Sequence, residues 1–126
     1  MDQVAANPDE SAFSEITDFC KHCSDGDIDK IREKLQQNAS IIDWKDISGY
    51  APLHWACLYD RTEVVTLLLE NGADVLAQGP NEETPFHWAA QGDAIKSLPI
   101  ILEAVKKLLG TLKKKKTNEE FLIKYF

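Results

Sequence analysis

The chain has 126 residues, of which 44% are hydrophobic and 28% are charged, and this size favours one domain with a core that needs neither disulfides nor metal. No apolar run approaches the roughly 18 residues that span a bilayer. The polar, acidic start is unlike a signal or transit peptide, so three cysteines predict a reducing, intracellular and cytoplasmic location. Residues 1–104 carry 7 Lys and Arg against 19 Asp and Glu, which disfavours nucleic acid as the main ligand.

Two helices are predicted in the N-terminal third, after a flexible acidic segment at residues 1–10. Phe13, Ile16 and Phe19 fit one face of the first helix. A turn follows at residues 24–27, where Asp27 is placed to cap the second helix. This helix carries an apolar face of Ile28, Ile31 and Leu35.

A repeat of 33 residues governs the middle of the chain. The segment APLHWAC at residues 51–57 recurs as TPFHWAA at residues 84–90. Each copy places a proline in the first turn of a helix, where its missing N–H costs nothing. The first copy continues with an apolar helix at residues 63–70, which Gly72 is suited to end. Residues 46–49 and 79–82 are expected to form hairpin-like fingers.

The second helix of the last copy departs from this pattern. Ser97 is a candidate cap and Pro99 falls in the first turn, after which apolar residues recur at Ile101, Val105, Leu108 and Leu112. We expect this helix to run to about Leu112 and to close the core.

Residues 113–126 form a separate basic segment. Lys113–Lys116 are interpreted as a solvated linker. Alternatively, they form a nuclear-import signal, which would add a nuclear location, a phosphate patch or a contact with an anionic membrane. Thr117 and Glu120 have the spacing of a capping box, which predicts a short C-terminal helix with an apolar end.

The repeated segments resemble the ankyrin repeat, whose pattern is T-P-L-H-x-A followed by V-x-L-L-L and G-A-D. The resemblance implies an all-α solenoid of helix-turn-helix units at about 11–45, 46–78 and 79–112, with finger loops, a divergent N-terminal cap and an extended C-terminal capping helix. It also implies that the repeated His54 and His87 are structural.

No enzyme motif, cofactor or metal is expected. Cys20 and Cys23 form a C-x-x-C pair, but a structural zinc site usually needs four ligands and no second pair accompanies them. They are interpreted as structural cysteines, with a redox or metal function as a weaker alternative.

The resemblance implies partner contacts at the finger tips and on the exposed side of the first helix of each pair, along a concave face. These positions are Ile47, Ser48, Tyr50, Trp55, Leu58, Tyr59, Asn81, Glu83, Trp88 and Gln91. Trp55 and Trp88 occupy the same repeat position and should lie side by side. Alternatively, both pack between units.

Four acidic residues are expected at the rim of this surface: Asp46, Asp60, Glu82 and Glu83. They favour a partner with an apolar anchor flanked by Lys or Arg. The predicted function is a monomeric, non-catalytic protein-protein interaction module. The alternative is an accessory ankyrin region of an acyl-CoA-binding protein or a palmitoyltransferase whose other domain is absent from this chain.

Overall fold

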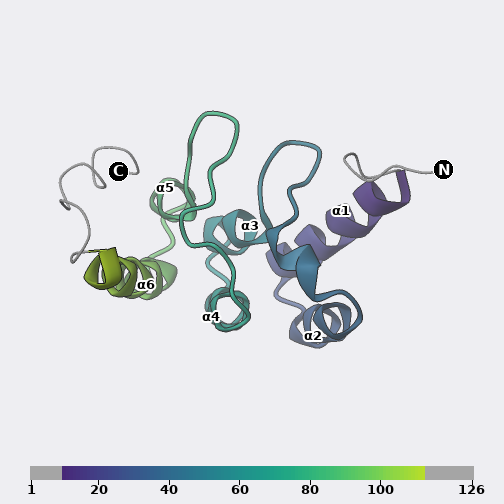
Figure 1. Cartoon of the computed structure of the whole chain (residues 1–126), viewed down its shortest axis with the longest axis horizontal. Helices are drawn as coiled ribbons and strands as arrows, with labels where there is room; N and C mark the ends of the chain where they lie inside the picture. Colours follow the sequence, from purple (N-terminus) through teal and green to yellow (C-terminus); the bar gives the residue numbers. More distant parts are fainter. Residues whose placement is uncertain (1–9, 113–126) are drawn as a thin grey trace.

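The computed structural model describes residues 10–112 and is built from pairs of antiparallel helices (Figure 1). Within that range it contains no strands. The elements are α1 (Glu10–Asp25), α2 (Ile28–Gln37), the 3-10 helix η1 (Ala39–Asp43), α3 (Pro52–Leu58), α4 (Thr62–Glu70), α5 (Pro85–Gln91) and α6 (Ser97–Leu112). The predicted segments at residues 1–9 and 113–126, including the lysine run, lie outside the described residues.

The helices form two rows (Figure 1). The first helix of each pair, namely α1, α3 or α5, lies in one row, and its partner lies in the other. Helix α3 packs between α1 and α5, while α4 packs against α6. The loops before α3 and before α5 project as fingers from the side of the first row. The expected all-α solenoid is confirmed.

The turn between the two helices of each pair has the same backbone conformation three times. Gly26, Asp60 and Asp93 all have positive φ, at 80°, 56° and 58°. Asp60 and Asp93 are one repeat apart, whereas Gly26 precedes Asp60 by 34 residues. The turn of the first unit is therefore offset by one residue from the 33-residue spacing of the other two.

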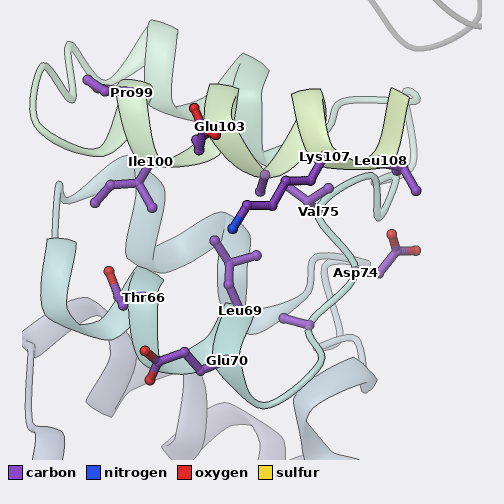
Figure 2. Close-up of a pocket in the computed structure, with 12 residues that line it drawn as sticks. Thr66, Leu69, Glu70, Asp74, Val75, Pro99, Ile100, Glu103, Lys107 and Leu108 are labelled. Atoms are coloured by element: carbon purple, nitrogen blue, oxygen red, sulfur yellow. The ribbon is translucent and has the colours of Figure 1, made fainter. Parts of the chain in front are cut away.

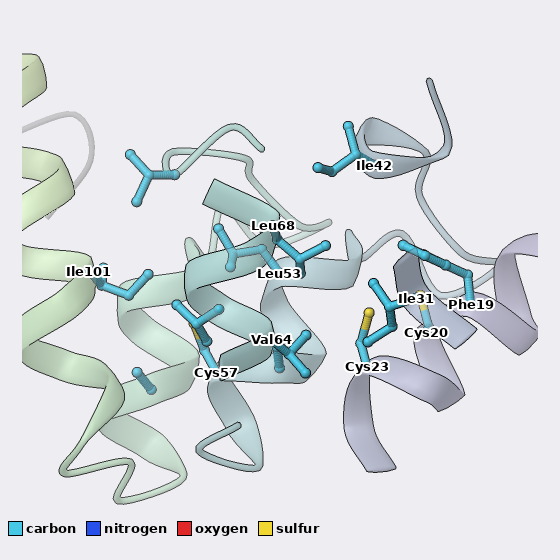
Figure 3. Packing of buried hydrophobic residues seen from close by; sticks show 14 of the residues in the cluster. Phe19, Cys20, Cys23, Ile31, Ile42, Leu53, Cys57, Val64, Leu68 and Ile101 are labelled. Carbon is cyan, nitrogen blue, oxygen red and sulfur yellow. The ribbon is translucent and has the colours of Figure 1, made fainter. Parts of the chain in front are cut away.

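The apolar core runs continuously through all three pairs (Figure 3). Phe19 and Ile31 are buried between the first two helices, Leu53 and Leu68 lie in the middle pair, and Ile101 comes from α6. Because one pair cannot bury its own apolar side, each unit depends on its neighbours for stability.

The start of α6 is held by the preceding unit, and the sequence-based expectation for Ser97 was wrong. Ser97 is the first residue of α6, and its N–H donates to Asp60 Oδ1 at 2.8 Å. Desolvation would raise the pKa of Asp60, but hydrogen bonds from Ser97 and Lys96 outweigh it and lower that pKa. The ionised carboxylate thus acts as the cap that the local sequence lacks.

The two repeated histidines support the starts of α3 and α5. His54 Nδ1 accepts from the Ala51 N–H at 3.1 Å, so its Nε2 carries the proton and donates to the Glu83 carbonyl at 2.9 Å. His87 Nδ1 accepts from the Thr84 N–H at 2.9 Å. Both rings therefore have structural partners.

Leu68→Ala tests the shared core. Leu68 is completely buried, so we expect the free energy of unfolding to fall by ~2–5 kcal/mol. The control is Thr66→Ala, two residues away on the same helix, where the side chain is exposed, and it should change stability little. Chemical denaturation followed by circular dichroism measures both, and an unchanged unfolding midpoint for Leu68→Ala would contradict this fold.

The buried His54 predicts a loss of stability at mildly acidic pH. Its pKa lies below the ordinary value, chiefly because burial disfavours the charged ring. As the pH falls through about 6.5, the unfolded chain takes up a proton here while the folded chain does not, so unfolding becomes easier. Urea denaturation between pH 7.5 and pH 5 measures how steeply the free energy of unfolding decreases as the pH falls.

The matched variant is His54→Asn, whose amide does not titrate. We expect it to reduce the pH slope, whatever its stability at pH 7.5. Asp60 and Glu83 do not interfere, because their pKa values are lowered and their contributions are lost only at more acidic pH. An equal slope in both proteins would show that His54 does not cause it.

Candidate functional site

We call the surface formed by the two fingers together with α3, Tyr59 directly after it, and α5 the finger face (Figure 1). It contains all ten residues that the sequence singles out for partner contact. Its geometry follows from the repeat, because equivalent residues of the two units are brought next to one another. Ser48 and Asn81, for example, occupy equivalent exposed positions in the two fingers.

An aromatic cluster of Tyr50, His54, Trp55 and Trp88 joins the two units. The centroids of the Trp55 and Trp88 rings lie 5.0 Å apart and meet edge to face. Tyr50 lies against Trp88 with a centroid separation of 4.3 Å. Such aromatic pairs add roughly 0.5–1.5 kcal/mol beyond the area that they bury.

Hydrogen bonds fix the orientation of the cluster. The indole Nε1 of Trp55 donates to Asp46 Oδ2 at 2.9 Å, and the hydroxyl of Tyr50 donates to Glu83 Oε2 at 2.6 Å. The other oxygen of Asp46 accepts from the backbone N–H groups of Ser48 and Tyr50. The half-buried tryptophans therefore pack between the units.

The hydrogen bond between Tyr50 and Glu83 shifts the pKa values of the two groups in opposite directions. The hydrogen bond from Tyr50 is the main reason that the pKa of Glu83 lies below its ordinary value. The same hydrogen bond, with desolvation, raises the pKa of Tyr50. At neutral pH an ionised carboxylate thus accepts from a protonated phenol, which is a strong, charge-assisted arrangement.

Side chains next to the first finger also contact the backbone of the second finger. Lys45 Nζ donates to the carbonyl oxygen of Gln78 at 2.7 Å. The Tyr50 ring lies so close to Gly79 that an added Cβ would collide with it. Because glycine has no side chain, it allows this approach. The second finger is consequently held against the first.

Two large apolar residues of the predicted set are exposed. Ile47 at the tip of the first finger is 81% exposed, and Tyr59 immediately after α3 is 53% exposed. In the sequence, Ile47 precedes α3 and Tyr59 directly follows it, with Trp55 of α3 between them. Leu58 instead covers Gly92 of the next unit, and Gln91 is exposed at the end of α5.

The acidic rim needs a correction. Asp46 and Glu83 accept hydrogen bonds inside the finger face, and Asp60 lies in the α3–α4 turn, where it caps α6. Of the four acidic residues named above, only Glu82 has an exposed side chain. The sequence indicated these carboxylates but not their long-range partners, Trp55, Tyr50, Lys96 and Ser97, which lie 9 to 37 residues away.

The cysteines are buried thiols in the helical core. Burial is the main reason that the pKa of Cys20 and the pKa of Cys23 are raised, and it raises the pKa of Cys57 to about 12. Reactive or metal-binding cysteines act as thiolates, so these environments oppose such chemistry. No group of three or more potential ligands that could hold a metal ion occurs among the residues that the structure describes.

The chain is similar to segments of much larger proteins. It is 31% identical to palmitoyltransferase Hip14 of Drosophila melanogaster over 98 residues, which cover 77% of this chain and 15% of that protein. Palmitoyltransferase AKR1 of Lachancea kluyveri is 31% identical over 84 residues, 64% of this chain and 11% of that one. The human 2-5A-dependent ribonuclease is 34% identical over 70 residues, 56% of this chain and 9% of the other.

In the described part of the chain, the longest apolar helices fall short of what is needed to cross a membrane. A family model for ankyrin repeats in three copies matches residues 19–119. Because this match covers more than half of the chain and agrees with the helix pairs and fingers, the chain belongs to the ankyrin-repeat family.

Proposed function

We propose that this chain is a non-catalytic interaction module that binds a protein partner through its finger face. Ankyrin repeats are protein-interaction modules. The observation that carries the proposal is the exposure of Ile47 and Tyr59 on this face. Large apolar side chains that remain in water at a structured surface are typical of contact sites.

The aromatic cluster gives this surface a rigid centre. Tyr50, Trp55 and Trp88 are partly accessible, and their side chains are oriented by rings and hydrogen bonds that exist before any partner arrives. A partner therefore does not have to order these residues, which lowers the entropic cost of binding. We expect Ile47 and Tyr59 to supply direct contacts and the tryptophans to supply both contact and support.

The charge of the chain favours a partner segment with basic residues around an apolar anchor. The formal net charge is −7, and Glu82 lies exposed at the second finger. Asp46 and Glu83 still contribute negative potential although they accept internal hydrogen bonds. Complementary charge increases the rate of association and discriminates against acidic partners.

The described residues support a module without catalysis. Both ring nitrogens of His54 have structural partners, and the cysteine thiols are buried with raised pKa values. General acid–base or nucleophilic catalysis needs such groups to reach a substrate. Their engagement in the fold is consistent with binding alone.

A second candidate function is that of an accessory ankyrin region in a palmitoyltransferase-type or acyl-CoA-binding protein. The similarity to two palmitoyltransferases favours the former class. This chain spans only 11–15% of those proteins. In either case the described residues would supply recognition, with any catalytic step performed elsewhere. Sequencing the complete transcript would show whether a further domain is encoded with this one.

The double substitution Ile47→Ser, Tyr59→Ser tests the finger face. Because both side chains are exposed, we expect the variant to keep the wild-type melting temperature and to lose most partner capture. Affinity purification with quantitative mass spectrometry compares the two proteins. A matched control is Ile95→Ser, Leu102→Ser, which removes two exposed apolar residues (70% and 43%) outside the finger face.

The results for the two double variants together decide the interpretation. Equal capture by wild type and by the Ile47→Ser, Tyr59→Ser variant would place the partner on another surface. Capture that is lost only with Ile95→Ser, Leu102→Ser would place it near α6.

Trp55→Ala should behave differently from the exposed pair. It removes the edge-to-face contact with Trp88 and the hydrogen bond to Asp46, so we expect it to lower the free energy of unfolding by ~1–3 kcal/mol. Thermal unfolding measures this loss, with Tyr59→Ala as the comparison. A wild-type melting temperature for Trp55→Ala would show that the cluster does not support the stacking of the units.

A further inference from the structure

A groove between α4 and α6 lies outside the finger face (Figure 2). It has a volume of about 900 Å³ and is also bordered by the loop that follows α4. Helices α4 and α6 belong to the second row of the solenoid, whereas α3 and α5 of the first row form the finger face (Figure 1). Binding in this groove therefore does not depend on the function proposed for the finger face.

Apolar side chains from both helices form the walls of the groove. Leu69 lines it from α4, while Ile100, Ala104 and Leu108 recur every four residues along one side of α6. Figure 2 shows Leu69 and Ile100 between the ribbons of the two helices. Leu69, Ile100 and Leu108 are only half-buried, so apolar surface remains accessible to a ligand.

Small residues give the groove room for a side chain of the ligand. Ala104 lies between Ile100 and Leu108 along α6, and Ala73 lines the groove from the loop after α4. A larger side chain of a ligand can enter beside Ala104, in the same way that the ridges of one helix pack into the grooves of another. The α6 lining extends from Pro99 to Leu108, which is about 14 Å along a helix axis and matches a helix of about ten residues.

Carboxylates dominate the charge of the groove. Its described lining includes three exposed acidic residues, Glu70, Asp74 and Glu103, and one lysine, Lys107. Asp74 Oδ1 accepts from the Leu76 N–H at 2.9 Å, which fixes that carboxylate at the border of the groove. Three carboxylates against one ammonium group favour a ligand with positive charge and oppose docking on an anionic lipid surface.

We propose that the α4–α6 groove binds an amphipathic helix of a partner protein that carries Lys or Arg on both flanks of its apolar side. The apolar side packs against the walls of the groove, and one of its side chains enters the space beside Ala104. The basic residues pair with Glu70 on α4 and with Glu103 on α6. The finger face and the groove are then two separate binding surfaces on different rows of helices.

Synthetic peptides test the chemistry of this ligand. The probe is a fluorescent peptide of about ten residues, with Leu at the spacing i, i+3, i+4 and i+7 and Lys at the other positions. A staple on its polar side keeps so short a peptide helical. One control peptide has the same composition in an order that forms no apolar side, and a second has Glu in place of Lys.

Fluorescence anisotropy measures the dissociation constant of each peptide from the full chain. We expect the basic amphipathic probe to bind at least about tenfold more tightly than either control peptide. Added salt should weaken its binding, because salt screens exposed charges. Absence of saturable binding by the probe, or equal binding by either control peptide, would overturn the proposal.

Ala104→Leu tests whether the probe lies in the groove. The added side chain fills the space beside α6, and leucine is a good helix former, so we expect about tenfold weaker binding of the probe by a folded protein. The matched control is Ala90→Leu, at an exposed position of α5 outside the groove, which should bind the probe like the wild type. Circular dichroism confirms that both variants are folded, and equal affinities for both would contradict this site.

Charge neutralisation gives a second measure that changes no packing in the groove. Glu70→Gln, Glu103→Gln should weaken binding of the probe several-fold and reduce its dependence on salt. Asp18→Asn, Glu33→Gln changes the net charge equally at exposed positions outside the groove and should leave the affinity unchanged. Equal affinities for the two double variants would contradict the role of the carboxylates.

The finger-face variant Ile47→Ser, Tyr59→Ser separates the two binding surfaces. We expect it to bind the probe like the wild type, because neither residue belongs to the groove. Loss of probe binding in this variant would place the amphipathic helix on the finger face and overturn the proposal for the groove. Because the capture experiment on the finger face uses a different ligand, either proposal can fail without the other.

Discussion

The stacking of consecutive helix pairs is the interaction on which the rest of this structure depends. No pair buries its apolar side alone, so the contacts between units determine stability. Glu83 shows how this is achieved, because its carbonyl accepts from His54 and its carboxylate accepts from Tyr50 of the preceding unit. Asp60 makes the equivalent connection at the other end of the pair by capping α6.

This dependence explains why the finger face has two kinds of residue. Tyr50, Trp55 and Trp88 lie at the junction of two units, so their rings contribute to stacking as well as to the surface. Ile47 and Tyr59 lie beyond the junction and are exposed. Side chains that join units must be retained for the fold to be stable. Side chains beyond the junction can differ without loss of stability, so their identity can be matched to a partner. The proposed function rests on this division between support and contact.

The two sides of the molecule differ in chemistry. On the finger face, hydrogen bonds have already engaged Asp46 and Glu83, and aromatic rings dominate. Between α4 and α6, the carboxylates line an apolar groove. An occupant of the groove and a partner on the finger face would meet different side chains. Because α4 and α6 also carry part of the shared core, the groove lies close to the contacts that stabilise the last unit.

The sequence by itself determined the repeat, because helix starts at Pro52 and Pro85, the helix end at Gly72 and the apolar spacing are local properties of the chain. It also placed Trp55 beside Trp88, since a regular stack brings equivalent residues together. Only the tertiary structure decided the partners of Asp46, Asp60 and Glu83, and with them the correction to the acidic rim and to Ser97. The long-range partners, Trp55, Tyr50 and Ser97, lie in other elements or other units, and the geometry that brings them within hydrogen-bonding distance exists only after the helices have packed.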